Sequence, residues 1–128
     1  MVVDTSALVA ILRDEPQRDA FINILATAKE PVISAATLLE ASMVLSRFRN
    51  GIANLDELLA TAGVQVMAVD AAQAFAAREA WLEHGKGRGN AAKLNFGDCF
   101  SYALAVTTGR PLLYKGDDFA QTDVVSAA

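Results

Sequence analysis

Several features are scarce in this sequence, and each scarcity excludes a class of protein. The chain contains one cysteine, Cys99, so no disulfide can form within it. No apolar run reaches the roughly 20 residues that a membrane-spanning helix needs, because charged residues or glycines interrupt every run. The first residues, Met-Val-Val-Asp, lack the basic flank of a secretory signal. We therefore expect a cytoplasmic protein without a membrane segment.

Positive charge is also scarce. Eleven Lys and Arg stand against 15 Asp and Glu, which gives a formal net charge of -4 and a pI of about 4.8. This balance argues against a protein that grips nucleic acid through its overall charge, although it leaves open a local basic patch or an acidic site neutralised by metal. The 128 residues are 53% hydrophobic, which predicts a single domain over residues 1–128 with a substantial core.

Short apolar segments alternate with helical patterns along the whole chain. We expect strands at residues 1–3, 31–34, 64–69 and 111–114, with a candidate fifth strand at 124–125, and helices at 7–12, 18–28, 35–48, 54–62, 70–84 and 97–108. This alternation is typical of an α/β fold, a three-layer α/β/α sandwich with a short parallel central sheet. In such folds the site forms at the carboxyl ends of the strands, where the chain direction diverges.

Acidic residues occupy unusual places for solvated surface charge. Asp4 ends the first strand, Asp98 lies in the first turn of a helix, and Asp117 and Asp118 follow the last core strand. Each has an ordinary structural explanation when taken alone. Asp4 can cap a helix, Asp98 can form a capping box with Asn95, and the last two can be turn residues.

Glu40 is harder to explain structurally, because its helical neighbours three and four residues away are largely apolar. Two carboxylates about 4 Å apart repel by about 4 kcal/mol at an effective dielectric of 20, so a cluster of such acids calls for a cation. Oxygen ligands without histidine or cysteine favour Mg²⁺ or Mn²⁺ over Zn²⁺. A carboxylate-held Mg²⁺ or Mn²⁺ suits phosphodiester hydrolysis, with one further carboxylate orienting or deprotonating the attacking water.

The residues that carry this chemistry lie in four segments: Val2 to Ala7, Glu40 in its helix, Asn95 to Cys99, and Leu112 to Phe119. In their order and spacing these segments resemble the PIN-domain family and, more narrowly, the VapC toxins of bacterial toxin–antitoxin pairs. The resemblance covers the whole chain. It implies a Mg²⁺-dependent endoribonuclease, with Mn²⁺ as a substitute, that hydrolyses RNA and is neutralised by a cognate VapB-type antitoxin. It also implies a homodimer or a toxin–antitoxin hetero-oligomer.

The same resemblance suggests roles for individual residues. Asp4 and Asp98 would be metal ligands, and Glu40 would be an essential acid. Ser6 would be a hydrogen-bonding residue of the pocket, with a role in capping the first helix as the alternative. The fourth acidic position is matched to Asp117, and a register shift of one residue would give it to Asp118 instead.

A Gly-rich loop carries the cations Lys86 and Arg88, followed by Lys93. These side chains are candidates for contacts with RNA phosphates, and a solvated loop is the alternative.

Two other classes of protein share parts of the pattern. A haloacid-dehalogenase-like phosphatase also has an aspartate after its first strand, but it needs a second acid two residues later, where this chain has Ser6. A receiver-like regulatory domain has a similar length and a late lysine, here Lys115, but its phosphoacceptor should end the middle strand, whereas Asp56 lies in a helical pattern. Neither class explains Glu40.

Overall fold

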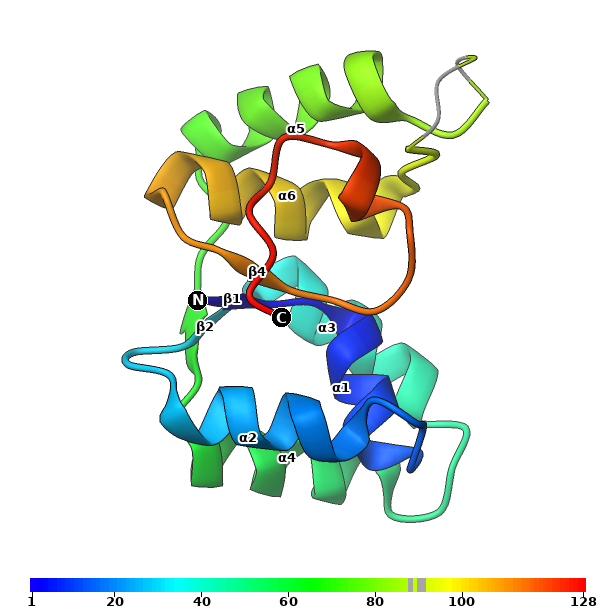
Figure 1. The fold of residues 1–128 in the computed structure, drawn as a ribbon, viewed down its shortest axis with the longest axis vertical. Helices are drawn as coiled ribbons and strands as arrows, with labels where there is room; N and C mark the ends of the chain where they lie inside the picture. The colour runs from blue at the N-terminus through cyan, green and yellow to red at the C-terminus, as the bar shows by residue number, and fades with distance from the viewer. Residues whose placement is uncertain (88, 90–91) are drawn as a thin grey trace.

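Four short parallel strands form the centre of the protein (Figure 1). The structure, a computed structural model, describes residues 1–87, 89 and 92–128. The strands are β1 (Val2–Val3), β2 (Val32–Ser34), β3 (Gln65–Met67) and β4 (Leu112–Leu113). They lie in the order β3-β2-β1-β4, and Val2 pairs with Val32 on one side and with Leu112 on the other. The order in which the strands follow one another therefore reverses between β1 and β4. This places the topological switch point of the sheet at the carboxyl end of β1.

The helices connect the strands and cover both faces of the sheet (Figure 1). They are α1 (Thr5–Leu12), α2 (Arg18–Thr27), α3 (Ala35–Leu45), α4 (Gly51–Ala62), α5 (Ala71–His84) and α6 (Phe96–Thr108), followed by a short 3₁₀ helix, η1 (Phe119–Gln121). Side chains of Asp4, Ser34, Asp70 and Asn95 cap the first turns of α1, α3, α5 and α6. None of the helices in the described part of the chain has the length and apolar character needed to cross a membrane.

Alternate residues of each central strand point to opposite faces of the sheet. Val2, Val32 and Leu112 belong to the core cluster that contains residues of α5 and α6. Their neighbours Val3, Ile33 and Leu113 belong to the cluster shared with α1, α2, α3 and α4. The central strands are buried on both faces, as expected for a parallel sheet between two layers of helices. The predicted α/β sandwich is confirmed.

The candidate fifth strand at residues 124–125 is the main difference from the expected sheet. The chain there makes only an isolated parallel bridge, between Leu112 and Ser126. The amide of Leu112 donates to the carbonyl of Val125 (2.8 Å), and the amide of Ala127 donates to the carbonyl of Leu112 (2.9 Å). Two hydrogen bonds to one residue hold the C-terminal segment against the edge of β4 without forming a strand.

Candidate acidic active site

Asp4 lies at the carboxyl end of β1, where the sheet changes direction, and it is almost fully buried (2% exposed). Its amide donates to the carbonyl of Leu113 at the end of β4 (3.0 Å). Its Oδ2 accepts hydrogen bonds from the amide (3.0 Å) and the hydroxyl (2.7 Å) of Ser6. The predicted capping role of Asp4 is confirmed, and the same hydrogen bonds fix the direction of its carboxylate.

One buried hydroxyl holds the other oxygen of Asp4, and a second buried hydroxyl contacts the first. Ser101 in α6 donates from Oγ to Oδ1 of Asp4 (2.6 Å), and its Oγ lies 3.1 Å from Oγ1 of Thr37 in α3. Ser101 and Thr37 are 0% and 1% exposed. Ser101 of α6 therefore connects the Asp4 carboxylate to Thr37 of α3, a helix on the other face of the sheet.

Ser6 links the site to the last strand of the sheet. Its hydroxyl accepts a hydrogen bond from the amide of Lys115, just beyond β4 (2.9 Å), while donating to Asp4. The Lys115 ammonium forms an ion pair with Glu15 (3.1 Å). These contacts agree with the expected role of Ser6 as a hydrogen-bonding residue of the pocket.

Glu40 projects from α3 toward the beginning of α6. Its Oε1 accepts a hydrogen bond from Oγ1 of Thr5 (2.5 Å). Its Oε2 lies so close to Gly97 that an ideal Cβ at that position would be 1.7 Å away. Burial raises the pKa of Glu40, and the charge of Asp4 raises it further, against the lowering effect of the Thr5 hydrogen bond. Glu40 is therefore an acid held beside other acids on a half-buried face.

Asp98 is both a capping residue and a member of the acidic site. Its amide donates to Oδ1 of Asn95 (2.9 Å), and its Oδ2 accepts from the amide of Asn95 (3.0 Å), which completes the predicted capping box. Burial raises the pKa of Asp98 to about 6 in spite of that backbone hydrogen bond, and the charges of Asp4, Glu40 and Asp118 contribute to the rise.

The fourth acidic position lies in the exposed segment between β4 and η1. Asp118 is one of the carboxylates whose charge raises the pKa of Asp98, and Asp117 is not among them. Gly116 has a φ of +100° and turns the chain immediately before this pair. The assignment of this position to Asp117 stays a prediction, and the electrostatic coupling to Asp98 supports the alternative register, with Asp118.

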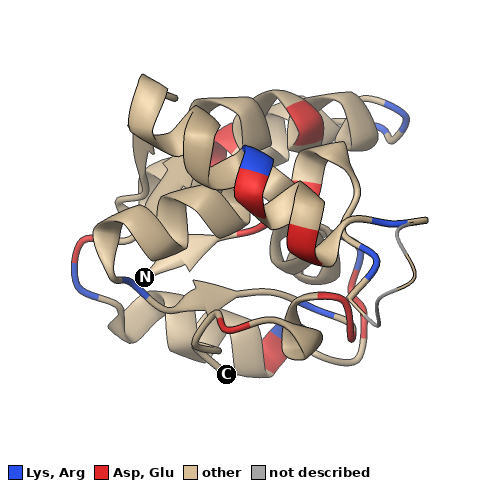
Figure 2. Ribbon diagram, turned by 90° about the horizontal axis from the view of Figure 1, so that it is seen from above, with Lys and Arg blue, Asp and Glu red and all other residues tan. Residues whose placement is uncertain are grey.

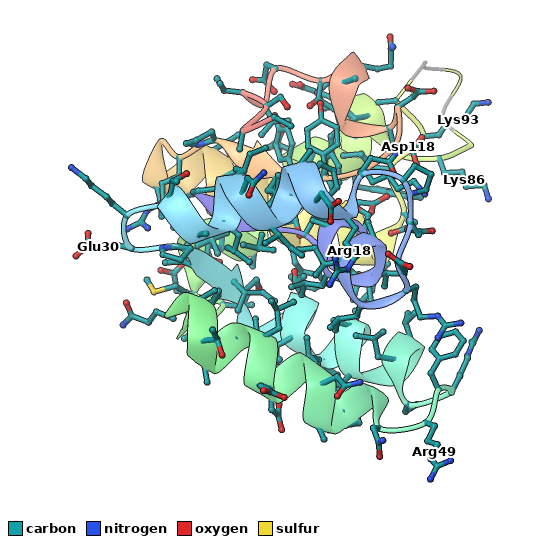
Figure 3. The ribbon with its side chains drawn as sticks, turned by 60° about the horizontal axis from the view of Figure 1, so that its bottom comes forward. Arg18, Glu30, Arg49, Lys86, Lys93 and Asp118 are labelled. Carbon is teal, nitrogen blue, oxygen red and sulfur yellow. The ribbon has the colours of Figure 1, made fainter. Side chains whose placement is uncertain are left out.

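Basic residues lie near one edge of the acidic site. Figure 2 shows blue segments on either side of the grey residues, and Figure 3 shows Lys86 and Lys93 on the same side of the molecule as Asp118. Lys86 and Lys93 are exposed. The third predicted cation, Arg88, lies outside the described residues.

The donor set of the site fits a hard divalent cation. Within residues 1–87, 89 and 92–128, no three Asp, Glu, His or Cys side chains lie close enough to form a complete ligand cage. Even so, Asp4, Glu40 and Asp98 interact electrostatically, and the last two have raised pKa values because their ionised forms are poorly solvated and face like charges. A cation among these oxygens would relieve both effects. Carboxylates with water completing the shell are the ligands that Mg²⁺ prefers.

The sequence analysis did not predict the roles of three residues of this site: Thr37, Gly97 and Ser101. Helical spacing could have pointed to two of them, because Thr37 precedes Glu40 by three residues and Ser101 follows Asp98 by three, which puts each on the same helix face as an acid. Gly97 is explained only by the close approach of α3 to α6.

Comparison with known proteins agrees with this arrangement. The family model described as PIN domain matches residues 1–125. The chain is 54% identical over 130 residues to a protein named ribonuclease VapC from Mycolicibacterium smegmatis, covering 98% of each chain. It is 47% identical over 129 residues to ribonuclease VapC28 from Mycobacterium tuberculosis, covering 99% of this chain and 97% of the relative.

Solved structures share the fold at low sequence identity. One is Mycobacterium tuberculosis VapC20, described as a toxin that cleaves the sarcin-ricin loop, with a TM-score of 0.76, 22% identity and coverage of 97% of this chain and 95% of that one. Another is VapBC2 from Rickettsia felis bound to a DNA fragment from its promoter, with a TM-score of 0.72, 18% identity and coverage of 98% and 94%.

Proposed function

The chain belongs to the PIN-domain family, and we propose that it is a divalent-metal-dependent endoribonuclease of the VapC type, the toxin of a toxin–antitoxin pair. The observation that carries the proposal is that Asp4, Glu40 and Asp98, from three separate segments, lie near enough to one another at the carboxyl end of β1 for the charge of Asp4 to raise the pKa of both Glu40 and Asp98. Relatives named as ribonucleases match almost the whole chain, and the chain covers 97% and 98% of their lengths. The two alternative hypotheses, a haloacid-dehalogenase-like phosphatase and a receiver-like domain, would place the chain in other protein families.

Asp4 and Asp98 would hold the metal, with Mg²⁺ as the proposed ion and Mn²⁺ as a substitute. When bound, the ion would polarise the scissile phosphoryl group and lower the pKa of a water molecule. The residues of the chain supply the positioning. Ser6 and Ser101 fix the Asp4 carboxylate from both sides, and the capping box fixes Asp98.

Glu40 is proposed to orient the attacking water or accept its proton. Thr5 holds one carboxylate oxygen, and the raised pKa brings Glu40 closer to the range in which a carboxylate accepts a proton effectively. The fourth acid, Asp117 or Asp118, would complete the negative charge at the exposed side of the site.

The proposed partners are cellular RNA, a VapB-type antitoxin and a second copy of the chain. One of the solved structures that share the fold is described as a toxin–antitoxin complex from Klebsiella pneumoniae, with a TM-score of 0.74. We place the activity in the cytoplasm, where RNA and a co-expressed antitoxin would be met.

Substitution of Asp4 by Asn tests the function. The amide oxygen of Asn can still cap α1, and the Ser101 hydroxyl can rotate to accept from the new NH₂ group, so the fold should persist. We expect the purified wild-type protein to cleave single-stranded RNA in the presence of Mg²⁺ or Mn²⁺, and we expect cleavage to stop in EDTA. The Asp4→Asn variant should be at least 100-fold less active.

Asp56→Asn, an exposed acid of α4, is the matched control and should cleave like wild type. Circular dichroism and thermal unfolding establish that both variants fold. Metal-dependent cleavage by Asp4→Asn, or a stable aspartyl phosphate after treatment with acetyl phosphate, would contradict the proposal.

A further inference from the structure

A groove of about 620 Å³ lies between α5 and α6. We name it the α5–α6 groove. Its walls include the rings of Trp81, Phe96 and Phe100, together with small side chains such as Ala77. The rings of Phe96 and Phe100 meet edge to face, with centroids 4.9 Å apart at 84°. The groove is therefore an aromatic surface outside the acidic site.

The aromatic residues of the groove are unusually open to solvent. Phe96 is 79% exposed and Trp81 is 38% exposed. Phe96 is the first residue of α6, directly before the glycine that accommodates Glu40. Exposed aromatic surface next to a catalytic centre is typical of a binding site rather than of packing.

The charge of the groove differs from that of the protein as a whole. The described residues that line it include the cations Arg78 and Lys86 and no carboxylate, although the chain has a net charge of -4. Arg78 also lies over the ring of Phe75, 4.8 Å from its centroid. An aromatic wall flanked by cations suits a ligand that combines flat rings with negative charge.

The groove is continuous with the acidic site through Asn95. This residue lines the groove and also forms the capping box with Asp98. Asn95 and Asp98 exchange hydrogen bonds of 3.0 and 2.9 Å, so a strand whose phosphate lay at Asp98 would pass the mouth of the groove within a nucleotide or two.

We propose that the α5–α6 groove binds an unpaired base of the RNA substrate beside the cleaved phosphate, stacked on Phe96 and Trp81, with Arg78 and Lys86 near the neighbouring phosphates. The inference rests on the proposed ribonuclease function. Proteins recognise single-stranded RNA by such stacking on aromatic side chains combined with cationic contacts to the backbone. Cleavage would then be restricted to single-stranded regions, where a base can leave its neighbours.

A segment of a partner protein is the competing occupant of an apolar groove. The described lining residues include two cations and no acid, which favours a nucleotide over a protein segment. The groove also reaches Asn95, which forms the capping box with Asp98 of the proposed cleavage site. The experiment below separates the two.

Trp81 is the only tryptophan of the chain and lines the groove, so its fluorescence reports on the occupant. The probes are a short single-stranded oligoribonucleotide and an abasic oligomer of the same length, titrated in EDTA so that no cleavage occurs. We expect the oligoribonucleotide to quench Trp81, and the abasic oligomer to bind more weakly without quenching.

Phe96→Ala should weaken oligoribonucleotide binding about tenfold, while Phe96→Tyr, which keeps a stacking ring, should retain it. Phe48→Ala removes a partly exposed ring that does not line the groove and serves as the matched control. Thermal unfolding of each variant checks the fold, which an exposed side chain should not disturb.

Equal binding of the abasic and normal oligomers, or unchanged binding by Phe96→Ala, would overturn the base site while wild-type cleavage still supports the ribonuclease. Loss of neutralisation by the co-expressed antitoxin, with RNA binding intact in Phe96→Ala, would assign the groove to a protein instead. Absence of any RNA cleavage by wild type would remove the proposed function itself.

Discussion

The carboxylate of Glu40 occupies the space that a side chain at position 97 would need. An ideal Cβ on Gly97 would lie 1.7 Å from Oε2 and 2.5 Å from Cδ of Glu40. Such distances are far below van der Waals contact, so the approach of α3 to the first turn of α6 depends on this glycine. The acidic site thus includes a residue without any side chain.

Gly97→Ala should displace Glu40 and reduce RNA cleavage at least tenfold. We expect the free energy of unfolding to fall by about 1–3 kcal/mol, the usual cost of overpacking. In a Glu40→Ala background the added methyl group has room, so the same change should cost little further in activity or stability. Cleavage rates and denaturant unfolding of the four proteins form a double-mutant cycle. Additive effects would show that the clash is not the cause.

Ser101→Ala should weaken metal binding as well as stability. The Ser101 hydroxyl donates to Oδ1 of Asp4 in a fully buried position, and hydrogen bonds to charged groups contribute about 1.5–3 kcal/mol. We expect a higher Mn²⁺ concentration at half-maximal cleavage and a lower Mn²⁺ affinity by calorimetry. Ser42→Ala is the control, because that hydroxyl bonds only the carbonyl of Leu38 within its own helix among the described contacts. Lowered stability with unchanged Mn²⁺ affinity would limit Ser101 to a structural role.

The stability of the metal-free protein should fall as the pH rises between about 4 and 6. The folded protein holds the Asp98 proton up to a pKa of about 6, whereas an unfolded aspartate loses it near 3.8, so the folded state binds more protons in this window. Asp98→Asn should flatten this part of the profile in thermal unfolding with EDTA present. Added Mg²⁺ should raise the melting temperature more at pH 7 than at pH 5, because protons and metal compete for the same carboxylate. A profile that rises across this window in EDTA would contradict the assignment.

Asp117→Asn and Asp118→Asn distinguish the two registers of the fourth acid. If Asp118 faces the site, its substitution should lower the pKa of Asp98, measured by carboxyl-carbon NMR, and should reduce cleavage more than Asp117→Asn does. Both residues are exposed, so neither change should alter the melting temperature by more than a degree or two. The reverse order of effects would restore Asp117 to the site.

The sequence predicts most of the fold because local patterns determine it. Apolar strands such as residues 31–34 alternate with capped helices, and the parallel sheet with helices on both faces follows from that alternation. The replacement of a strand at residues 124–125 by an isolated bridge at Ser126 could not be predicted, because it depends on how much of the edge of β4 the C-terminal segment can reach.

The acids of the site could be selected from the sequence, but the contacts that hold them could not. Glu40 was conspicuous because an ionisable residue interrupts an apolar helix face. Its contact with Gly97 joins two residues that lie 57 positions apart in the sequence, on different helices. No local sequence pattern encodes such a contact. The choice between Asp117 and Asp118 likewise depends on the conformation of the turn at Gly116. The sequence alone does not determine which of the two residues follows that turn into the site.

The hydrogen bond from the amide of Lys115 to Ser6 spans 109 positions of the chain. Together with the bond from the Asp4 amide to Leu113, it means that the first strand acquires its site geometry only from the last one. On the ribosome, residues 1–112 are synthesised before these partners exist. A protein truncated before β4 would carry Asp4, Glu40 and Asp98 without the backbone that orients the first of them. Nuclease activity therefore requires a chain that extends through β4 to Lys115, and chains terminated before β4 are expected to be harmless to the cell that makes them.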